Sequence, residues 1–146
     1  MARQARKFSS SGIYHVVNKG TGNQIIFEED IDYQTFIYFM TYYKKKFNIK
    51  ILAYCLMENH FHLLLLDNDH KLSNFMQNLE GSYAMYFNQY HKRCGHFFAN
   101  RFKSETVEDN QYFTNVLHYI LKNPQKAGID NYKNQIPQEY CEPILQ

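Results

Sequence analysis

The sequence lacks several features that would place it in a well-defined class at once. It has no tryptophan, and only three prolines and three cysteines among its 146 residues. Cys55, Cys94 and Cys141 are scattered and form no Cys-x-x-Cys pair, which argues against a disulfide scaffold and against a zinc finger. Three unpaired thiols fit a reducing compartment, so we expect a cytoplasmic protein.

Long hydrophobic runs are also missing. The longest cover residues 51–57 and 63–66, which are too short to span a bilayer, and residues 1–7 lack the apolar segment of a signal peptide. No repeat, low-complexity tract or Pro/Gly linker divides the chain. We therefore expect no membrane partner and a single domain over residues 1–146, with a basic arm at 1–10 and a partly irregular tail at 130–146.

Strong charge of one sign is absent, whereas aromatic rings are abundant. The formal net charge is only +2, so a nucleic-acid surface would have to come from local clustering of Lys and Arg. The 13 tyrosines and 12 phenylalanines make up 17% of the chain. That number of phenols exceeds what a small core needs and points to stacking surfaces or to chemistry.

Hydrophobic periodicity predicts an α+β, ferredoxin-like fold. We expect the element order β-α-β-β-α-β-α, with helices packed on a small, mostly antiparallel sheet. Asp30 or Asp32 is expected to cap the first helix, and Pro124 to stop the last one. The expected strands cover residues 13–17, 49–57, 60–66 and part of 94–108, the expected helices cover 31–47, 72–92 and 110–123, and a tight turn covers 57–59.

Two polar patterns within these elements could carry chemistry. His60 and His62 alternate along a strand, so their imidazoles share one face and could bind a metal ion, although two half-buried histidines without a ligand would give the same pattern. On the last helix, Tyr119 and Asn123 are neighbours four residues apart within a polar stripe. Tyr119 could instead pack and Asn123 cap the helix, and Tyr112 on the same stripe is the rival nucleophile.

Together, these patterns and their surroundings resemble the HUH single-tyrosine transposases, and most closely the REP-associated subgroup. The resemblance runs from about residue 10 to residue 129. The matching stretches are Tyr14-His15-Val16-Val17-Asn18-Lys19-Gly20, residues 53–64, residues 95–104, and Tyr119-Ile120-Leu121-Lys122-Asn123-Pro124.

The resemblance implies an enzyme that cleaves and rejoins single-stranded DNA next to hairpins through a 5′-phosphotyrosine. It implies Tyr119 as the nucleophile and His60, His62 and Asn123 as ligands of Mg²⁺ or Mn²⁺, on a ferredoxin-like sheet with helices on one side. It leaves a homodimer open, because relatives include both dimers and monomers. The family usually has Pro where this chain has Glu58, so Glu58 is either part of a turn, which we favour, or an additional ligand.

Basic residues gather in the matching stretches and at the N-terminus, interleaved with aromatic rings such as Phe97 and Phe98, for which core packing is the simpler interpretation. Lys44-Lys45-Lys46 reads as a helix end. The expected DNA contacts are Arg3, Arg6, Lys7, Arg93, Arg101, Lys103, Lys122 and Lys126. Three alternatives stay open: a hairpin-binding relative without cleavage, a metal nuclease that uses water as nucleophile, and a ferredoxin-like RNA-binding module.

Overall fold

A four-stranded antiparallel sheet with the order β2-β3-β1-β4 forms the centre of the fold. The computed structural model describes residues 7–126, except the side chains of residues 121 and 123–126. Its element order confirms the predicted β-α-β-β-α-β-α pattern and the α+β class. The elements are β1 Ile13–Lys19, a short 3-10 turn η1 Thr21–Asn23, α1 Asp30–Lys46, β2 Lys50–Leu56, β3 His60–Leu66, α2 Leu72–Tyr90, β4 Lys103–Thr106 and α3 Asn110–Lys126.

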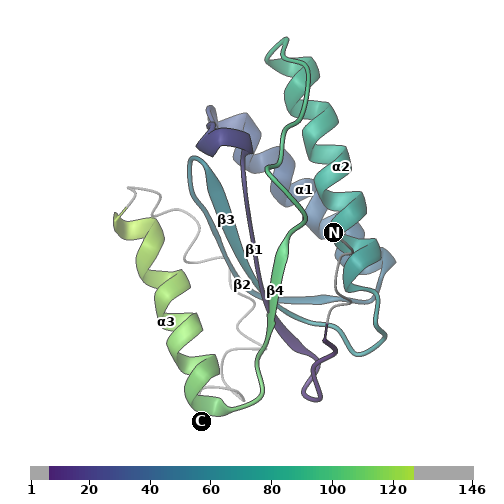
Figure 1. Cartoon of the computed structure of the whole chain (residues 1–146), viewed down its shortest axis with the longest axis vertical. Helices are drawn as coiled ribbons and strands as arrows, with labels where there is room; N and C mark the ends of the chain where they lie inside the picture. Colours follow the sequence, from purple (N-terminus) through teal and green to yellow (C-terminus); the bar gives the residue numbers. More distant parts are fainter. Residues whose placement is uncertain (1–6, 127–146) are drawn as a thin grey trace.

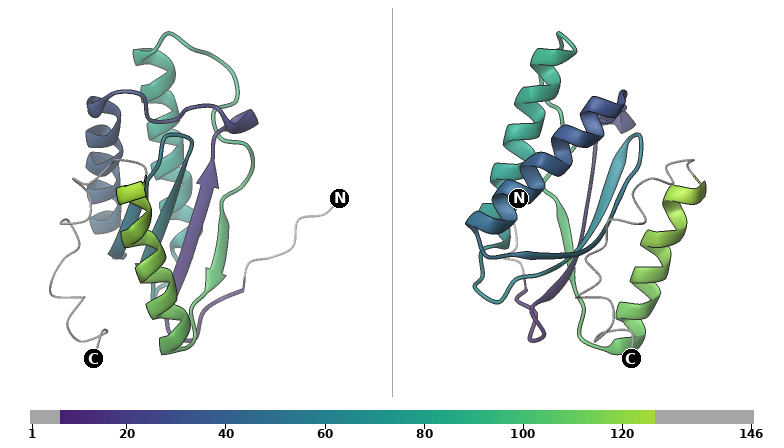
Figure 2. Two further views of the ribbon diagram at one scale, coloured as in Figure 1. Left: turned by 90° about the vertical axis from the view of Figure 1, so that its left-hand side faces the viewer. Right: turned by 180° about the vertical axis from the view of Figure 1, so that it is seen from behind.

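The helices cover both faces of the sheet, so the expectation of helices on one side is wrong. Helices α1 and α2 lie together against one face, and α3 lies against the other (Figure 1; Figure 2). The cause is visible in β3, whose central residues are buried on both faces: Phe61 and Leu63 join the core under α1 and α2, and Leu64 joins the core under α3. A strand with a continuous apolar run needs cover on each side.

The ends of two helices differ from expectation. The residue before α1 is Glu29, and the Asp32 carboxylate reaches back to accept the N–H groups of Glu28 (3.0 Å) and Glu29 (2.9 Å). Helix α3 continues through Pro124 to Lys126, so Pro124 does not stop it. A proline lacks the backbone N–H that would bond to the preceding turn. Two residues before the end of a helix, this loss affects few other hydrogen bonds, so the helix can continue through the proline.

The turn between β2 and β3 is tight, as predicted. The Met57 N–H donates to the His60 carbonyl at 2.8 Å, and the Glu58 carbonyl accepts the N–H groups of Ile26 (2.7 Å) and Phe27 (3.1 Å). Backbone bonds to the segment before α1 therefore fix this turn. Because β3 begins at His60, the turn also sets which β3 residues face α3.

Candidate active site

The alternation of β3 places His60 and His62 on the face of the sheet that α3 covers. The neighbouring residue Phe61 points the other way, into the core under α1 and α2. In the register of the sheet, His60 pairs with Lys19 and His62 pairs with Val17, both on β1. The two imidazole rings lie at 82° to each other with centroids 5.2 Å apart. The strand geometry thus brings the two imidazoles together, as the spacing predicts.

Hydrogen bonds orient both imidazoles through the same ring atom. His60 Nδ1 lies 2.7 Å from Asn59 Oδ1, and His62 Nδ1 lies 3.0 Å from Nε2 of His15 on β1. Within the described residues, neither Nε2 has a hydrogen-bond partner. Histidines that bind metals use one ring nitrogen while a neighbour holds the N–H of the other. These residues therefore fit a divalent ion bound by the two Nε2 atoms.

Burial keeps these imidazoles in the neutral form that binds metals. Burial, together with the neighbouring His15 and His60 rings, lowers the pKa of His62 to about 3. Burial also lowers the pKa of His60, and that of His15 against the opposing effect of the Glu105 charge. Protons therefore do not compete strongly for the free ring nitrogens at neutral pH.

Tyr119 on α3 extends over the His62 ring. The two rings meet edge to face, with centroids 5.1 Å apart and planes at 77°. The buried stripe of α3, which includes Val116 and Ile120, seats the helix on the sheet and leaves Tyr119 at the border of that contact. Its side chain stays 51% exposed, so the phenol is open to a ligand as large as DNA. The residues of a single chain bring this tyrosine and the imidazoles together.

Tyr112, the rival tyrosine, is engaged elsewhere. Its hydroxyl donates to the carboxylate of Glu105 on β4. Burial, this hydrogen bond and the Glu105 charge raise the pKa of Tyr112 to about 12. A phenol held in this way is harder to deprotonate and has its oxygen occupied, which makes Tyr112 the weaker candidate of the two.

Glu58 does not join the two histidines. It is exposed in the bend before β3, and among residues 7–126 it forms no cluster of ligand atoms with His60 and His62. Its charge instead acts on Tyr33 of α1. The pKa of the Tyr33 phenol is raised to about 12, mainly by burial and then by the charges of Glu58, Asp30, Asp32 and Cys55. The turn interpretation of Glu58 therefore agrees with the structure, and the ligand hypothesis does not.

The expected DNA contacts fall into three groups. Lys103 is exposed on β4 opposite Val17, Arg101 is exposed just before β4, and Lys122 is exposed one turn after Tyr119, so these cations lie on the segments next to the site. Lys7 and Arg93 lie away from the site. Lys7 lines a pocket with His70 beyond the opposite end of β3. The Arg93 guanidinium donates to Asn88 Oδ1 and to the His96 carbonyl. Arg3 and Arg6, and the side chains of Asn123 and Lys126, lie outside the described residues.

Sequence reasoning missed Asn59 and Lys19 next to the histidine pair, and for His15 it left a place toward the site and simple packing equally open. Asn59 is hydrogen-bonded to Nδ1 of His60, and His15 is hydrogen-bonded to Nδ1 of His62. Lys19 is an exposed cation that lies opposite His60 in the register of β1 and β3. Alternation along β1 predicts that His15, Val17 and Lys19 share a face. Only the register between β1 and β3 shows that this face is the one with the histidines.

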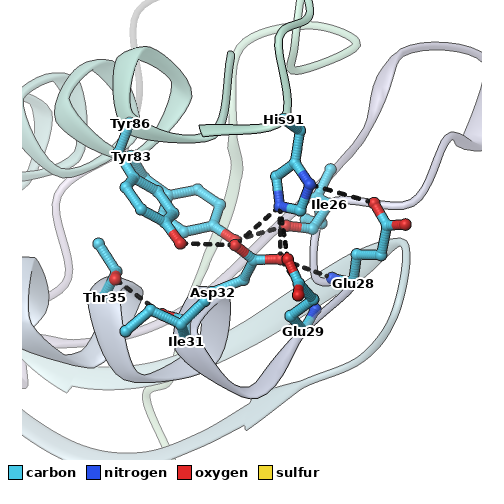
Figure 3. A network of polar contacts seen from close by, with 9 residues as sticks. All are labelled: Ile26, Glu28, Glu29, Ile31, Asp32, Thr35, Tyr83, Tyr86 and His91. Carbon is cyan, nitrogen blue, oxygen red and sulfur yellow. Dashed lines mark hydrogen bonds and ion pairs between the residues drawn. The ribbon is translucent and has the colours of Figure 1, made fainter. Parts of the chain in front are cut away.

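A second cluster of polar side chains lies on the opposite face of the sheet, between the start of α1 and the end of α2. Ligand atoms of Glu29, Asp32 and His91 lie within 4.8 Å of one another (Figure 3). Asp32 is fully buried and already accepts hydrogen bonds from Tyr86 Oη (2.7 Å), two backbone N–H groups and His91 Nε2 (2.9 Å). Because the Asp32 carboxylate oxygens are already occupied by hydrogen bonds, we interpret this cluster as a link between α1 and α2 and not as an open cation site.

Comparisons with known proteins agree with this fold. The family model described as "Transposase IS200 like" matches residues 8–123. The structure of a REP-associated tyrosine transposase bound to a REP hairpin superposes with a TM-score of 0.69 at 16% identity, over 88% of this chain and 76% of that one. A crystal structure of a candidate transposase from Deinococcus radiodurans R1 superposes with a TM-score of 0.56 at 15% identity, over 83% and 97%. At these identities the two structures show the shared fold.

Two further results are negative. None of the curated proteins searched matches the sequence significantly. Among the helices of residues 7–126, none has the length and apolar content needed to cross a membrane.

Proposed function

Because the chain belongs to the IS200-like transposase family, we propose that it cleaves and rejoins single-stranded DNA with Tyr119 as the nucleophile, beside a divalent ion held by His60 and His62. One observation carries the proposal: the Tyr119 ring on α3 contacts the His62 ring, whose Nε2 is free within the described residues. The proposed nucleophile, which is half exposed, and a proposed metal ligand, which is buried, thus lie side by side although they come from different elements. Asn123, one turn after Tyr119, is proposed as the third ligand.

The proposed reaction is a transfer of a phosphodiester. The Tyr119 oxygen attacks the phosphorus and loses its proton, the bond from phosphorus to the 3′ oxygen breaks, and that oxygen leaves as a 3′-OH. The product is a 5′-phosphotyrosine, which keeps a phosphodiester and allows rejoining without ATP. A bound Mg²⁺ or Mn²⁺ would stabilise the charge on the non-bridging oxygens, and imidazole ligands favour Mn²⁺ over Mg²⁺.

The cations around the site support DNA as the substrate. Lys103, Arg101 and Lys122 are exposed, the first two at β4 and the third on α3 after Tyr119, and they can neutralise phosphates. The similar REP-associated transposase was solved with a REP hairpin, so we propose a hairpin with a single-stranded flank as the ligand of this chain. Tyr119 and the two imidazoles come from one chain, so the proposal does not require a second copy.

Covalent capture tests this proposal. The full chain is mixed with labelled hairpin DNA that carries single-stranded flanks taken from its own gene, with Mn²⁺ or with chelator, and resolved on a denaturing gel. We expect a band that depends on Mn²⁺, resists SDS and disappears in Tyr119→Phe. Tyr42→Phe is the matched control and should keep the band, because Tyr42 is an exposed tyrosine on α1, on the other face of the sheet.

Three outcomes would overturn the proposal. Cleavage without a covalent band would indicate a nuclease that uses water as nucleophile. Binding of the hairpin with neither product would indicate a relative that binds without cleavage. A covalent band that survives Tyr119→Phe and disappears in Tyr112→Phe would reassign the nucleophile.

A further inference from the structure

The bond between His15 and His62 determines which nitrogen of His62 can bind a metal. The planes of the two rings differ by only 14°, and Nε2 of His15 lies 3.0 Å from Nδ1 of His62 while the ring centres are 5.3 Å apart. The rings therefore meet through their nitrogen edges in nearly one plane. This is the geometry of a directed hydrogen bond and not of face-to-face stacking.

Two neutral imidazoles can make this bond in only two ways. If His62 Nδ1–H donates, its Nε2 carries a lone pair and can bind a cation. If His15 Nε2–H donates, the proton of neutral His62 must be on Nε2, which then cannot bind a cation. His62 Nε2 can therefore bind a cation only when His15 Nε2 accepts the hydrogen bond from His62 Nδ1–H.

The surroundings of His15 favour the first arrangement. Glu105 lies directly opposite His15 on β4, and its negative charge acts on the His15 ring. The Tyr112 hydroxyl holds that carboxylate in place. A fixed negative charge beside an imidazole strengthens its accepting nitrogen, as the outer carboxylate does in carboxylate–histidine–metal sites.

We infer that His15 is a positioning residue that accepts the His62 Nδ1–H and so fixes His62 in the tautomer whose Nε2 binds the divalent ion. This inference rests on the proposed function only in taking His62 as a metal ligand. His15 itself touches neither the substrate nor the ion. Glu105 and Tyr112 extend the same chain of contacts to β4 and α3.

The tautomer can be measured directly in metal-free protein by long-range ¹H–¹⁵N correlation spectra of the histidine rings. In the wild type we expect the His62 proton on Nδ1. In His15→Phe, which keeps a planar ring without an acceptor, we expect it to move to Nε2. His15→Gln offers a carbonyl acceptor and should restore Nδ1–H. His96→Phe replaces an exposed histidine in the loop after α2 and is the matched control.

Binding of Mn²⁺ alone, followed by electron paramagnetic resonance, gives the second measurement. Loss of a partner that orients a metal ligand costs about 10–100-fold in affinity, so His15→Phe should weaken Mn²⁺ binding by that factor and His15→Gln by less. His96→Phe should leave the affinity unchanged. Thermal unfolding of each variant separates these effects from loss of the fold.

The outcomes separate this inference from the proposed function. A wild-type His62 with its proton on Nε2, or an unchanged Mn²⁺ affinity in a folded His15→Phe variant, would overturn the role of His15. A wild-type protein that binds no Mn²⁺ but shows the Nδ1–H tautomer would instead remove the metal from the proposed function. In that case the His15–His62 assignment would still hold.

Discussion

Asp32 offers the sharpest test of how α1 is attached to α2. Its carboxylate is fully buried, and four donors converge on it: the Tyr86 hydroxyl, His91 Nε2, and the backbone N–H groups of Glu28 and Glu29 (Figure 3). Asp32→Ala removes the acceptor for all four at once. The variant therefore tests one carboxylate that ties the start of α1 to the end of α2.

The magnitude follows from what is left behind. A buried donor that is left without an acceptor costs about 1–3 kcal/mol. The backbone N–H groups lie near the surface, where water can replace part of the loss. The Tyr86 hydroxyl and the His91 Nε2–H lose their acceptor, so we expect Asp32→Ala to lower the free energy of unfolding by about 2–6 kcal/mol, which is about 1–3 kcal/mol for each of these two donors.

Urea unfolding followed by circular dichroism measures this change. Asp30→Ala is the matched control, because Asp30 is exposed in the first turn of the same helix and should contribute only the dipole effect of about 0.3–1 kcal/mol. If Asp32→Ala cost no more than Asp30→Ala, the converging hydrogen bonds would not stabilise the fold and the reasoning would be refuted.

The same carboxylate predicts a pH dependence. Burial alone would raise the pKa of Asp32, but hydrogen bonds from Tyr86, Glu29, His91 and Glu28 outweigh it and hold the pKa below its ordinary value. A lowered folded pKa adds stability above the unfolded value of about 4, and that stability is lost as the pH falls through the folded pKa. The stability difference between wild type and Asp32→Asn should therefore shrink below about pH 4.

Three further predictions concern the core, the DNA surface and the thiols. Phe61→Ala, at a fully buried position under α1 and α2, should cost about 3–5 kcal/mol in urea unfolding, and a loss below 1 kcal/mol would contradict the two-sided burial of β3. Lys103→Ala should weaken single-stranded DNA binding and reduce the salt slope by about 0.7, whereas Lys45→Ala, at the end of α1, should change neither in titrations by fluorescence anisotropy. Burial raises the pKa of the Cys55 thiol to about 12, so iodoacetamide at pH 8 should modify exposed Cys94 and spare Cys55 in peptide mass spectra of the native protein.

Local patterns were sufficient for the elements and for the pairing of the two histidines. Alternation along residues 60–66 predicts that His60 and His62 share a face, because the side-chain period of a strand does not depend on its neighbours. Helical periodicity likewise predicts the buried stripe of α3 and leaves Tyr119 beside it. These properties depend on residues within one or two turns of each other, so the sequence alone determines them.

Contacts between distant segments needed the tertiary structure. The apolar run of β3 indicates that both faces of the sheet are covered, but it does not show that α3 covers one face and α1 and α2 cover the other. It does not show that β1 and β3 pair in the register that puts His15 beside His62, since a shift by one residue would send His15 to the other face. The sequence thus determined which candidate residues share a face of a strand or helix, and the register of the sheet and the packing of α3 decided which of them meet.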